Sequence, residues 1–411
     1  MNSNDRTITG FTMAGHGMVH TYELSIPILM TVWLVEFSVT SATLGTVVAV
    51  GYGLFGVGAL PGGLLVDRFG SRTLIVACLF GMSLSFLLLS ILPGIAGIAV
   101  ALAIWGIAAS VYHPAALALI SNGVEQRGIG FAYHGMAGNI GIAGGPFATA
   151  LLLIALDWQT AVVVLAVPGL VAALAGLLIE FDESAAVAAA DGGERATEIH
   201  SFREFVDASK TIFAGGFAIV FVLVLFNGLY YRGVVTFLPE LLSGFLDGLV
   251  GAGTPDVLAE GPAAEEFDLS QYLYAGLLAV GVGGQYVGGR LTDAVDPERG
   301  LAGMLAILVV LALLFVPAAA TLPTLLAVSV ALGFALFAVQ PLSQATIAAY
   351  SPPGRRGLSF GYTYLAIFGI GALGASLVGA ALTYGSPAAA FVLLAGFAAV
   401  ALGFALLLLR R

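Results

Sequence analysis

The feature that most constrains this chain is a series of long apolar segments joined by mostly short connections. A membrane-spanning helix needs about 20 mostly apolar residues, and twelve segments of the sequence meet that length. The segments cover residues 8–32, 41–66, 72–92, 95–120, 128–155, 159–180, 211–240, 269–291, 299–317, 323–350, 357–384 and 387–409. Inside a bilayer the backbone must satisfy its own hydrogen bonds, so such segments fold as helices. The sequence therefore predicts an all-α membrane protein with twelve transmembrane helices.

The composition agrees with a lipid environment. Hydrophobic residues make up 59% of the 411 positions and charged residues only 9%, against about 25% charged residues in an ordinary soluble domain. The formal net charge is -10, and Lys210 is the only lysine. Nucleic-acid binding needs a basic surface, so we expect no nucleic-acid partner. An acidic, lysine-poor exterior is typical of a salt-loving prokaryote, and we expect such a source.

Positive charges predict the orientation of the helices. Thirteen of the 14 Lys and Arg residues fall in alternate connections or at the termini, and the remaining one, Arg232, lies within the seventh segment. The thirteen are Arg6, Arg68, Arg72, Arg127, Arg195, Arg203, Lys210, Arg290, Arg299, Arg355, Arg356, Arg410 and Arg411. Cytoplasmic connections carry an excess of positive charge. We therefore predict a plasma-membrane protein with both termini in the cytoplasm.

The two halves of the chain resemble each other. Gly106 precedes Pro114 by eight residues in the fourth segment, and Gly333 precedes Pro341 by the same number in the tenth. A repeat of this size is typical of transporters built from two bundles, whose substrate site lies between them near the bilayer midplane. We therefore predict two pseudo-symmetric six-helix bundles. The predicted parts are an N-terminal bundle, residues 1–180, a cytoplasmic linker, 181–210, and a C-terminal bundle, 211–411, with a long outer loop, 241–268.

The connection between the second and third segments carries a motif. Residues 63–72 read Gly-Leu-Leu-Val-Asp-Arg-Phe-Gly-Ser-Arg. With the twelve helices and the repeat, this run resembles the signature loop of the major facilitator superfamily. The resemblance implies the major facilitator fold and transport by alternating access. It also implies a conformational latch, in which the Asp67 carboxylate accepts hydrogen bonds from a neighbouring helix. The latch residues are Gly63, Asp67, Arg68, Gly70 and Arg72.

Two further stretches, residues 106–114 and 138–146, are similar to one branch of that superfamily, the fosmidomycin-resistance-like drug exporters. His16 matches a histidine of the branch, whereas His20 stands where its members often carry an acid. Residues 141–146 also resemble part of a motif of proton-coupled antiporters, although the glycine pair expected after it is absent. The resemblance implies an exporter driven by protons.

Ionisable side chains at membrane depth cost free energy and are therefore functional candidates. In the first segment, His16, His20 and Glu23 fall at about 0°, 40° and 340° around a helix, which is one narrow face. His113 lies in the fourth segment and His134 in the fifth. We predict that Glu23 carries the coupling proton together with these histidines. The alternative is that these groups only hydrogen-bond between helices, with His113 satisfying a carbonyl that a proline kink frees.

A second group of polar residues provides candidates for substrate binding. The candidates are Arg232, Asn227, Tyr231, Gln340 and Gln344. Arg232 can bind an anionic substrate, pair with Glu23, or extend to the membrane interface. The remaining polar and aromatic side chains either line an aqueous cavity or hydrogen-bond between helices.

These observations define the expected function. The sequence contains no phosphate-binding loop, no catalytic-triad spacing and no Cys/His metal cluster, so we expect no enzyme activity, no cofactor and no metal site. The leading prediction is a monomeric secondary transporter, an antiporter that exports a small drug-like or metabolic compound in exchange for protons. The alternative is a proton- or cation-coupled symporter that imports an organic anion held by Arg232. A membrane enzyme or a channel explains neither the repeat nor the signature loop.

Overall fold

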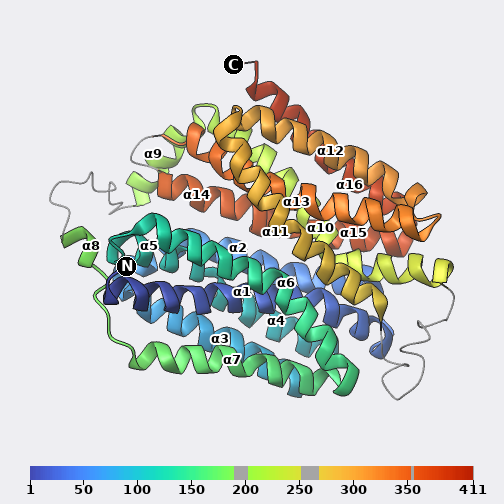
Figure 1. The fold of residues 1–411 in the computed structure, drawn as a ribbon, viewed down its shortest axis with the longest axis horizontal. Helices are drawn as coiled ribbons and strands as arrows, with labels where there is room; N and C mark the ends of the chain where they lie inside the picture. The colour runs from blue at the N-terminus through green and yellow to red at the C-terminus, as the bar shows by residue number, and fades with distance from the viewer. Residues whose placement is uncertain (189–201, 251–267, 353–355, 411) are drawn as a thin grey trace. The chain divides into compact units, whose positions relative to one another are not determined.

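The computed structural model describes residues 1–188, 202–250, 268–352 and 356–410, and every regular element in these ranges is a helix (Figure 1). The all-α prediction is therefore confirmed for the described part of the chain. The helices are α1 (Ser3–Glu36), α2 (Ser41–Phe69), α3 (Ser71–Ile91), α4 (Gly94–Ser110), α5 (Tyr112–Gly123), α6 (Arg127–Ala155), α7 (Trp158–Leu178), α8 (Ala185–Ala188), α9 (Phe202–Phe213), α10 (Phe217–Val250), α11 (Leu269–Ala294), α12 (Pro297–Ala318), α13 (Leu322–Tyr350), α14 (Arg356–Tyr364), η1 (Leu365–Ile370), α15 (Leu373–Tyr384) and α16 (Pro387–Leu408).

The predicted membrane spans are present as long helices. Within the described ranges, 11 helical segments are long and apolar enough to cross a membrane, counting α4 with α5 and α14 with α15 as one segment each. The remaining predicted span, the eighth in chain order, is α11, which has 26 residues but is more polar than the other eleven. It carries Gln271, Gln285 and Arg290. The structure thus contains a helix for each of the twelve predicted spans.

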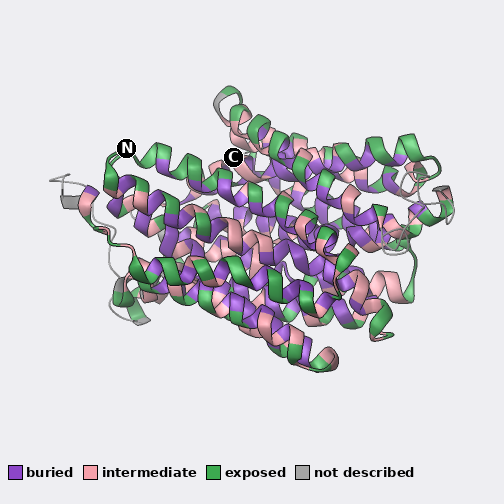
Figure 2. Cartoon of the chain, turned by 60° about the horizontal axis from the view of Figure 1, so that its bottom comes forward, coloured by how far each residue is buried: buried purple, intermediate pink, exposed green. Residues whose placement is uncertain are grey.

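Large apolar side chains lie on the outside of these helices as well as inside. In α7, Leu165 is buried, whereas Leu174 is 57% exposed and Leu178 is 82% exposed. Figure 2 shows the same alternation of buried and exposed residues along many helices. Exposing this much apolar surface to water is unfavourable, so an apolar environment must cover it. The hydrocarbon core of a bilayer is that medium for a chain with this many spans.

The fourth predicted span is broken in the structure. α4 ends at Ser110 and α5 begins at Tyr112, so the two helices meet at Val111. Pro114 has no backbone N–H, and a proline ring clashes with the carbonyl four residues earlier, here that of Ser110. The break therefore has a local cause, and it places His113 in the first turn of α5.

The eleventh predicted span changes its hydrogen-bond pattern in the middle. Between α14 and α15, the turn η1 is π-helical, and the Gly371 N–H donates to the Ala366 carbonyl at 2.8 Å. Gly228 of α10 packs against this turn, and a Cβ at position 228 would lie 2.7 Å from the Ile367 Cα. π-helical turns inside longer helices are frequent at functional sites. This turn contains Phe368, which lies beside the buried Arg232.

Close packing of α1 against α6 depends on glycine. A Cβ at Gly145 would lie 2.7 Å from the Thr21 Cα, and a Cβ at Gly141 would lie 3.1 Å from the Gly17 Cα. Small residues at such positions let helix backbones approach each other in a membrane. The glycines at 141 and 145 therefore have a packing role, and they hold α6 against the face of α1 next to His16.

The chain forms two compact units. The first unit comprises Met1–Gly192 and Val235–Gly276, and the second comprises Gly193–Val234 and Leu277–Arg411. α10 continues to Val250 through ten residues that the sequence placed at the start of the outer loop, because this stretch is mostly apolar and carries a single charge. The remainder of the predicted loop, 251–267, and residues 189–201 of the predicted linker lie outside the described ranges.

Candidate functional site

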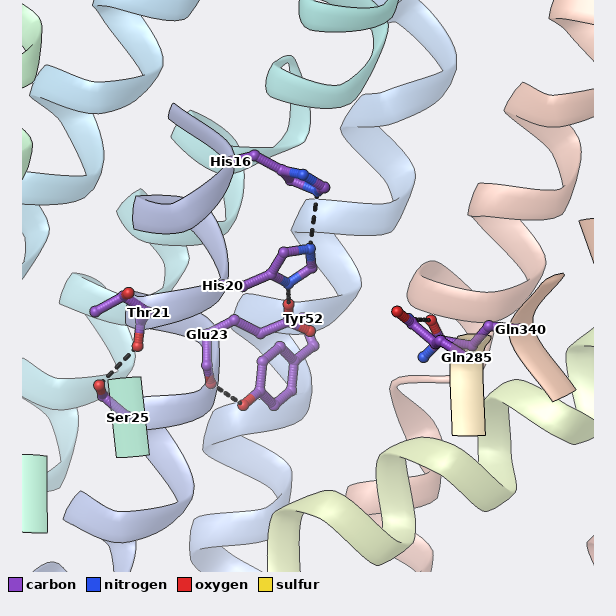
Figure 3. Close-up of polar contacts among 8 residues, drawn as sticks. All are labelled: His16, His20, Thr21, Glu23, Ser25, Tyr52, Gln285 and Gln340. Atoms are coloured by element: carbon purple, nitrogen blue, oxygen red, sulfur yellow. Dashed lines mark hydrogen bonds and ion pairs between the residues drawn. The ribbon is translucent and has the colours of Figure 1, made fainter. Parts of the chain in front are cut away.

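The polar face of α1 is the centre of the candidate site in the first unit. The His20 Nδ1 atom lies 2.8 Å from the Glu23 Oε2 atom, and the Nε2 atoms of His16 and His20 are 3.1 Å apart (Figure 3). Glu23 is only 1% exposed. The helical spacing had predicted one common face for these three residues, and the structure joins them in a continuous row of contacts.

Two more histidines reach this face from other helices. The ring of His134, from α6, stacks on that of His16 with centroids 3.9 Å apart. The His113 ring, from α5, lies 5.3 Å from the His16 ring and 5.8 Å from the His20 ring. We call His16, His20, His113 and His134 the histidine cluster. All five residues predicted as coupling candidates therefore lie together.

The backbone around the cluster leaves room for these rings. A Cβ at Gly138 of α6 would lie 2.6 Å from the His16 Nδ1 atom, so only glycine fits there with the present ring position. The same nitrogen lies 2.7 Å from the backbone carbonyl of His134, one turn earlier in α6. α6 therefore positions His16 in two ways. Gly138 leaves room for its ring, and the His134 carbonyl accepts a hydrogen bond from it.

The contacts of His16 and His20 determine where protons lie. A carbonyl oxygen only accepts hydrogen bonds, so the His16 Nδ1 carries a proton. When Glu23 is ionised, its carboxylate also only accepts, so the His20 Nδ1 donates to it. In neutral rings both Nε2 atoms then hold lone pairs, yet these two atoms lie at hydrogen-bond distance. One additional proton satisfies that contact, so the complete row holds one proton more than two neutral rings supply.

Two tyrosines that were not among the predicted site residues lie beside the cluster. The Tyr52 hydroxyl, from α2, donates to the backbone carbonyl of Glu23 at 3.0 Å. Tyr112, next to His113, donates its hydroxyl to the Thr12 carbonyl, and its ring lies parallel to that of His134. Both tyrosines are fully buried. In the sequence, Tyr112 was marked only by its place in the stretch 106–114 and by its adjacency to His113.

The substrate-binding candidates in the second unit form two separate contacts. Arg232 is fully buried, with its guanidinium carbon 5.7 Å from the centre of the Tyr231 ring and 5.9 Å from that of Phe368. Full burial does not fit the alternative that Arg232 extends to the membrane interface. The Gln285 Nε2 donates to the Gln340 Oε1 at 2.6 Å (Figure 3).

The other two candidates of this unit, Asn227 and Gln344, are buried and exposed respectively. Gln285 had not been predicted as a candidate, and nothing in its own segment marked it.

The predicted latch loop is partly visible. Gly70 has a φ of 79° between α2 and α3, a conformation that favours glycine. Arg72 donates to the carbonyls of Gly176 and Leu177 at the end of α7, both at 2.8 Å. Arg68 is exposed. Gly63 and Asp67 lie within α2, and the side chain of Asp67 is outside the described part of the structure. The described contacts thus tie Arg72 to α7.

Comparison with known proteins decides the family. The sequence matches the Major Facilitator Superfamily over residues 9–258 and 241–411. The chain belongs to this superfamily. It is therefore a multi-pass membrane transporter of small molecules and not an enzyme, as the signature loop and the repeat had indicated. No curated protein matches the chain.

Solved structures agree on the fold of this facilitator. A bacterial homolog of the human lysosomal transporter Spinster, in an inward-facing and occupied conformation, superposes with a TM-score of 0.74 at 15% identity, covering 100% of this chain and 98% of that one. The nucleoside transporter NupG superposes with a TM-score of 0.73 at 12% identity, covering 100% of both chains. At these identities the likeness shows the shared fold alone.

Proposed function

We propose that this facilitator is a proton-coupled antiporter that exports a small drug-like or metabolic compound by alternating access. The observation that carries the proposal is the row from the His134 carbonyl through His16 and His20 to Glu23, whose complete set of contacts requires one additional proton. A buried group that gains and loses one proton in each cycle is what coupling to a proton gradient requires. The resemblance to the fosmidomycin-resistance-like branch supports the direction of transport.

Glu23 is the proposed proton carrier. Its carboxylate contacts His20 on its own helix, and its backbone carbonyl accepts from Tyr52 of α2. His113 of α5 faces His16 and His20, and His134 of α6 lies behind His16. A proton can therefore pass between Glu23 and the histidines without crossing apolar side chains. Hydration of this face when the cavity opens to one side would favour release of the proton.

A proteoliposome assay tests this function. Purified protein is reconstituted, a pH gradient is imposed, and substrate-dependent proton flux is measured across a compound panel that includes fosmidomycin. We expect at least one compound to cause a flow of protons down the pH gradient. Glu23→Gln should abolish accumulation of that compound driven by the gradient, while its exchange across the membrane continues. Glu36→Gln, at the exposed end of the same helix, is the matched control. Full gradient-driven accumulation by Glu23→Gln would remove Glu23 as the carrier.

A second candidate function is import of an organic anion by symport. It rests on Arg232, a fully buried residue whose guanidinium lies near the rings of Tyr231 and Phe368. Guanidinium groups bind carboxylates and phosphates in a planar, two-point geometry. Anionic compounds in the same panel separate the two functions, because a symporter moves proton and compound in the same direction.

The proposed orientation places both termini and the linker in the cytoplasm, in the plasma membrane, and the chain acts as a monomer. Thr254, in the loop that lies outside the described residues, is then outside the cell. A Thr254→Cys variant made in a Cys78→Ala background should react with a membrane-impermeant thiol reagent added to intact cells. Protection of that cysteine until the membrane is opened would reverse the orientation.

A further inference from the structure

Three members of the histidine cluster converge on one point. His16, His20 and His113 each offer a ring nitrogen, and these three nitrogens all lie within 4.8 Å of one another. We propose that they bind a divalent transition-metal ion of the zinc class, a site in addition to the transport function proposed above. Imidazole nitrogen suits zinc, copper, nickel and iron, whereas magnesium and calcium prefer oxygen ligands.

The spacing of two ligands already fits a metal ion. Zinc–nitrogen bonds of about 2.0–2.1 Å in a tetrahedron place neighbouring ligand nitrogens about 3.3 Å apart. The Nε2 atoms of His16 and His20 are 3.1 Å apart. The two residues are four positions apart on α1, the spacing with which a helix presents two histidines to one zinc ion on a single face.

The outer contacts of both rings turn the correct nitrogen toward the ion. A histidine ligand usually donates its other ring N–H to a carboxylate or a backbone carbonyl, which fixes the tautomer. His16 donates its Nδ1 proton to the His134 carbonyl, and with Glu23 ionised His20 donates its Nδ1 proton to the Glu23 carboxylate. Both Nε2 lone pairs then face each other, and two facing lone pairs repel unless a cation lies between them. A metal ion supplies that cation in place of the additional proton.

The third ligand comes from a different helix. His113 lies in the first turn of α5 and presents its ring edge-on to His16, at an interplanar angle of 88°. The three nitrogens lie within 4.8 Å of one another, against about 3.3 Å between the ligands of a closed tetrahedron. A movement of the His113 ring toward the other two would close the set around the ion. The fourth position is left for water or for the Glu23 carboxylate.

His134 is assigned a supporting role. Its ring stacks flat on that of His16, with an interplanar angle of 12°, and its backbone carbonyl orients the His16 ring. A phenylalanine at this position keeps both the stacking and the carbonyl while removing the ring nitrogens. This makes His134→Phe the matched control for the three proposed ligands.

Metal binding is tested on the full chain, purified without a histidine tag and held in lipid nanodiscs. Equilibrium dialysis against Zn²⁺ should give one ion per chain. His20→Ala and His113→Ala should raise the dissociation constant at least ten-fold, and Glu23→Gln should raise it about ten- to a hundred-fold. His134→Phe should stay within about three-fold of the parent, because affinity falls ten-fold or more only when a group that orients a ligand is lost, and the orienting carbonyl is kept. Mg²⁺ should not compete.

Two measurements on the unaltered chain keep the proposal testable if a variant fails to fold. X-ray absorption at the zinc edge should show three imidazole ligands with Zn–N distances of about 2.0–2.1 Å, and Co²⁺ should give the intense visible absorption of a tetrahedral site. Fewer than three imidazoles, equal loss of binding in His134→Phe, or full binding by a His16→Ala/His20→Ala/His113→Ala variant would overturn the site. Because no transport is measured, these results stand or fall independently of proposed export.

Discussion

The two units share a scaffold but differ in the chemistry of their polar centres. In the first unit, a Cβ at Gly62 would lie 3.0 Å from the ring of Pro114, and in the second, a Cβ at Gly288 would lie 2.9 Å from the ring of Pro341. The residue before each proline differs. His113 belongs to the histidine cluster, whereas Gln340 pairs with the amide of Gln285.

This difference separates two kinds of work. Imidazole and carboxyl groups can gain and lose protons, imidazole near neutral pH, whereas glutamine amides only donate and accept hydrogen bonds. The first unit therefore has the side chains that proton coupling or metal binding needs, and the second has amides and a buried arginine, which suit recognition of a solute. Both halves of the repeat have a close contact between a glycine and a proline ring. The residue before the proline differs, and this residue determines whether the polar centre contains an imidazole or an amide.

The largest expected effect comes from placing the side chain of the second unit into the first. His113→Gln removes an imidazole from the cluster while keeping a polar side chain that suits the same position of the repeat. We expect loss of most of the pH-gradient dependence of transport, with substrate exchange retained. The measurement is gradient-driven accumulation in proteoliposomes. Gln340→His is the reciprocal control, and it should not increase coupling because its partner, Gln285, is an amide.

A smaller change to the cluster moves one ring without altering its chemistry. Gly138→Ala places a methyl group against His16, so the ring must shift away from the His134 carbonyl. We expect zinc affinity to fall about ten-fold, the lower end for disturbing an orienting contact. Gly135→Ala is the control on the same helix, since a Cβ there meets no atom within 4 Å. Equal zinc affinity in both variants would contradict the assigned position of His16.

The glycine–proline contacts test how alike the two scaffolds are. Gly288→Ala should destabilise the protein by about 1–3 kcal/mol, as overpacking does, because its Cβ also meets the backbone carbonyl carbon of Ala338 at 3.0 Å. Gly62→Ala should cost less, since the next atom there, a carbon of the Pro114 ring, lies 3.5 Å away. Unfolding in mixed detergent measures both. Gly289→Ala, which meets nothing within 4 Å, should change stability by no more than about 1 kcal/mol.

The sequence predicted those features of the site that depend on one helix alone. The common face of His16, His20 and Glu23 follows from the helical period alone, and the structure shows it. The convergence of His113 and His134 was not predictable as geometry, because it joins residues about a hundred positions apart in sequence. For the same reason, spacing along the chain gave no sign of a metal cluster.

Proline shows the limit of local signals within one helix. Pro114 accompanies a break at Val111 between α4 and α5, whereas α13 continues through Pro341 without interruption. The same residue at the same place in the repeat has two outcomes, so tertiary packing decides between them. The hydrogen bonds from Arg72 to the end of α7 could not be predicted either, because they depend on where α7 ends in space.

The smallest expected effect concerns the amide pair of the second unit. A double-mutant cycle with Gln285→Leu and Gln340→Leu isolates the energy of their hydrogen bond from the cost of each substitution. Interhelical hydrogen bonds in membrane proteins contribute about 0.6 kcal/mol on average, and we expect a coupling energy of that size in detergent unfolding. The corresponding cycle for His20→Leu and Glu23→Leu should give about 1.5–3 kcal/mol, because hydrogen bonds to charged groups are stronger. Equal coupling energies in the two units would contradict a charged hydrogen bond between His20 and Glu23.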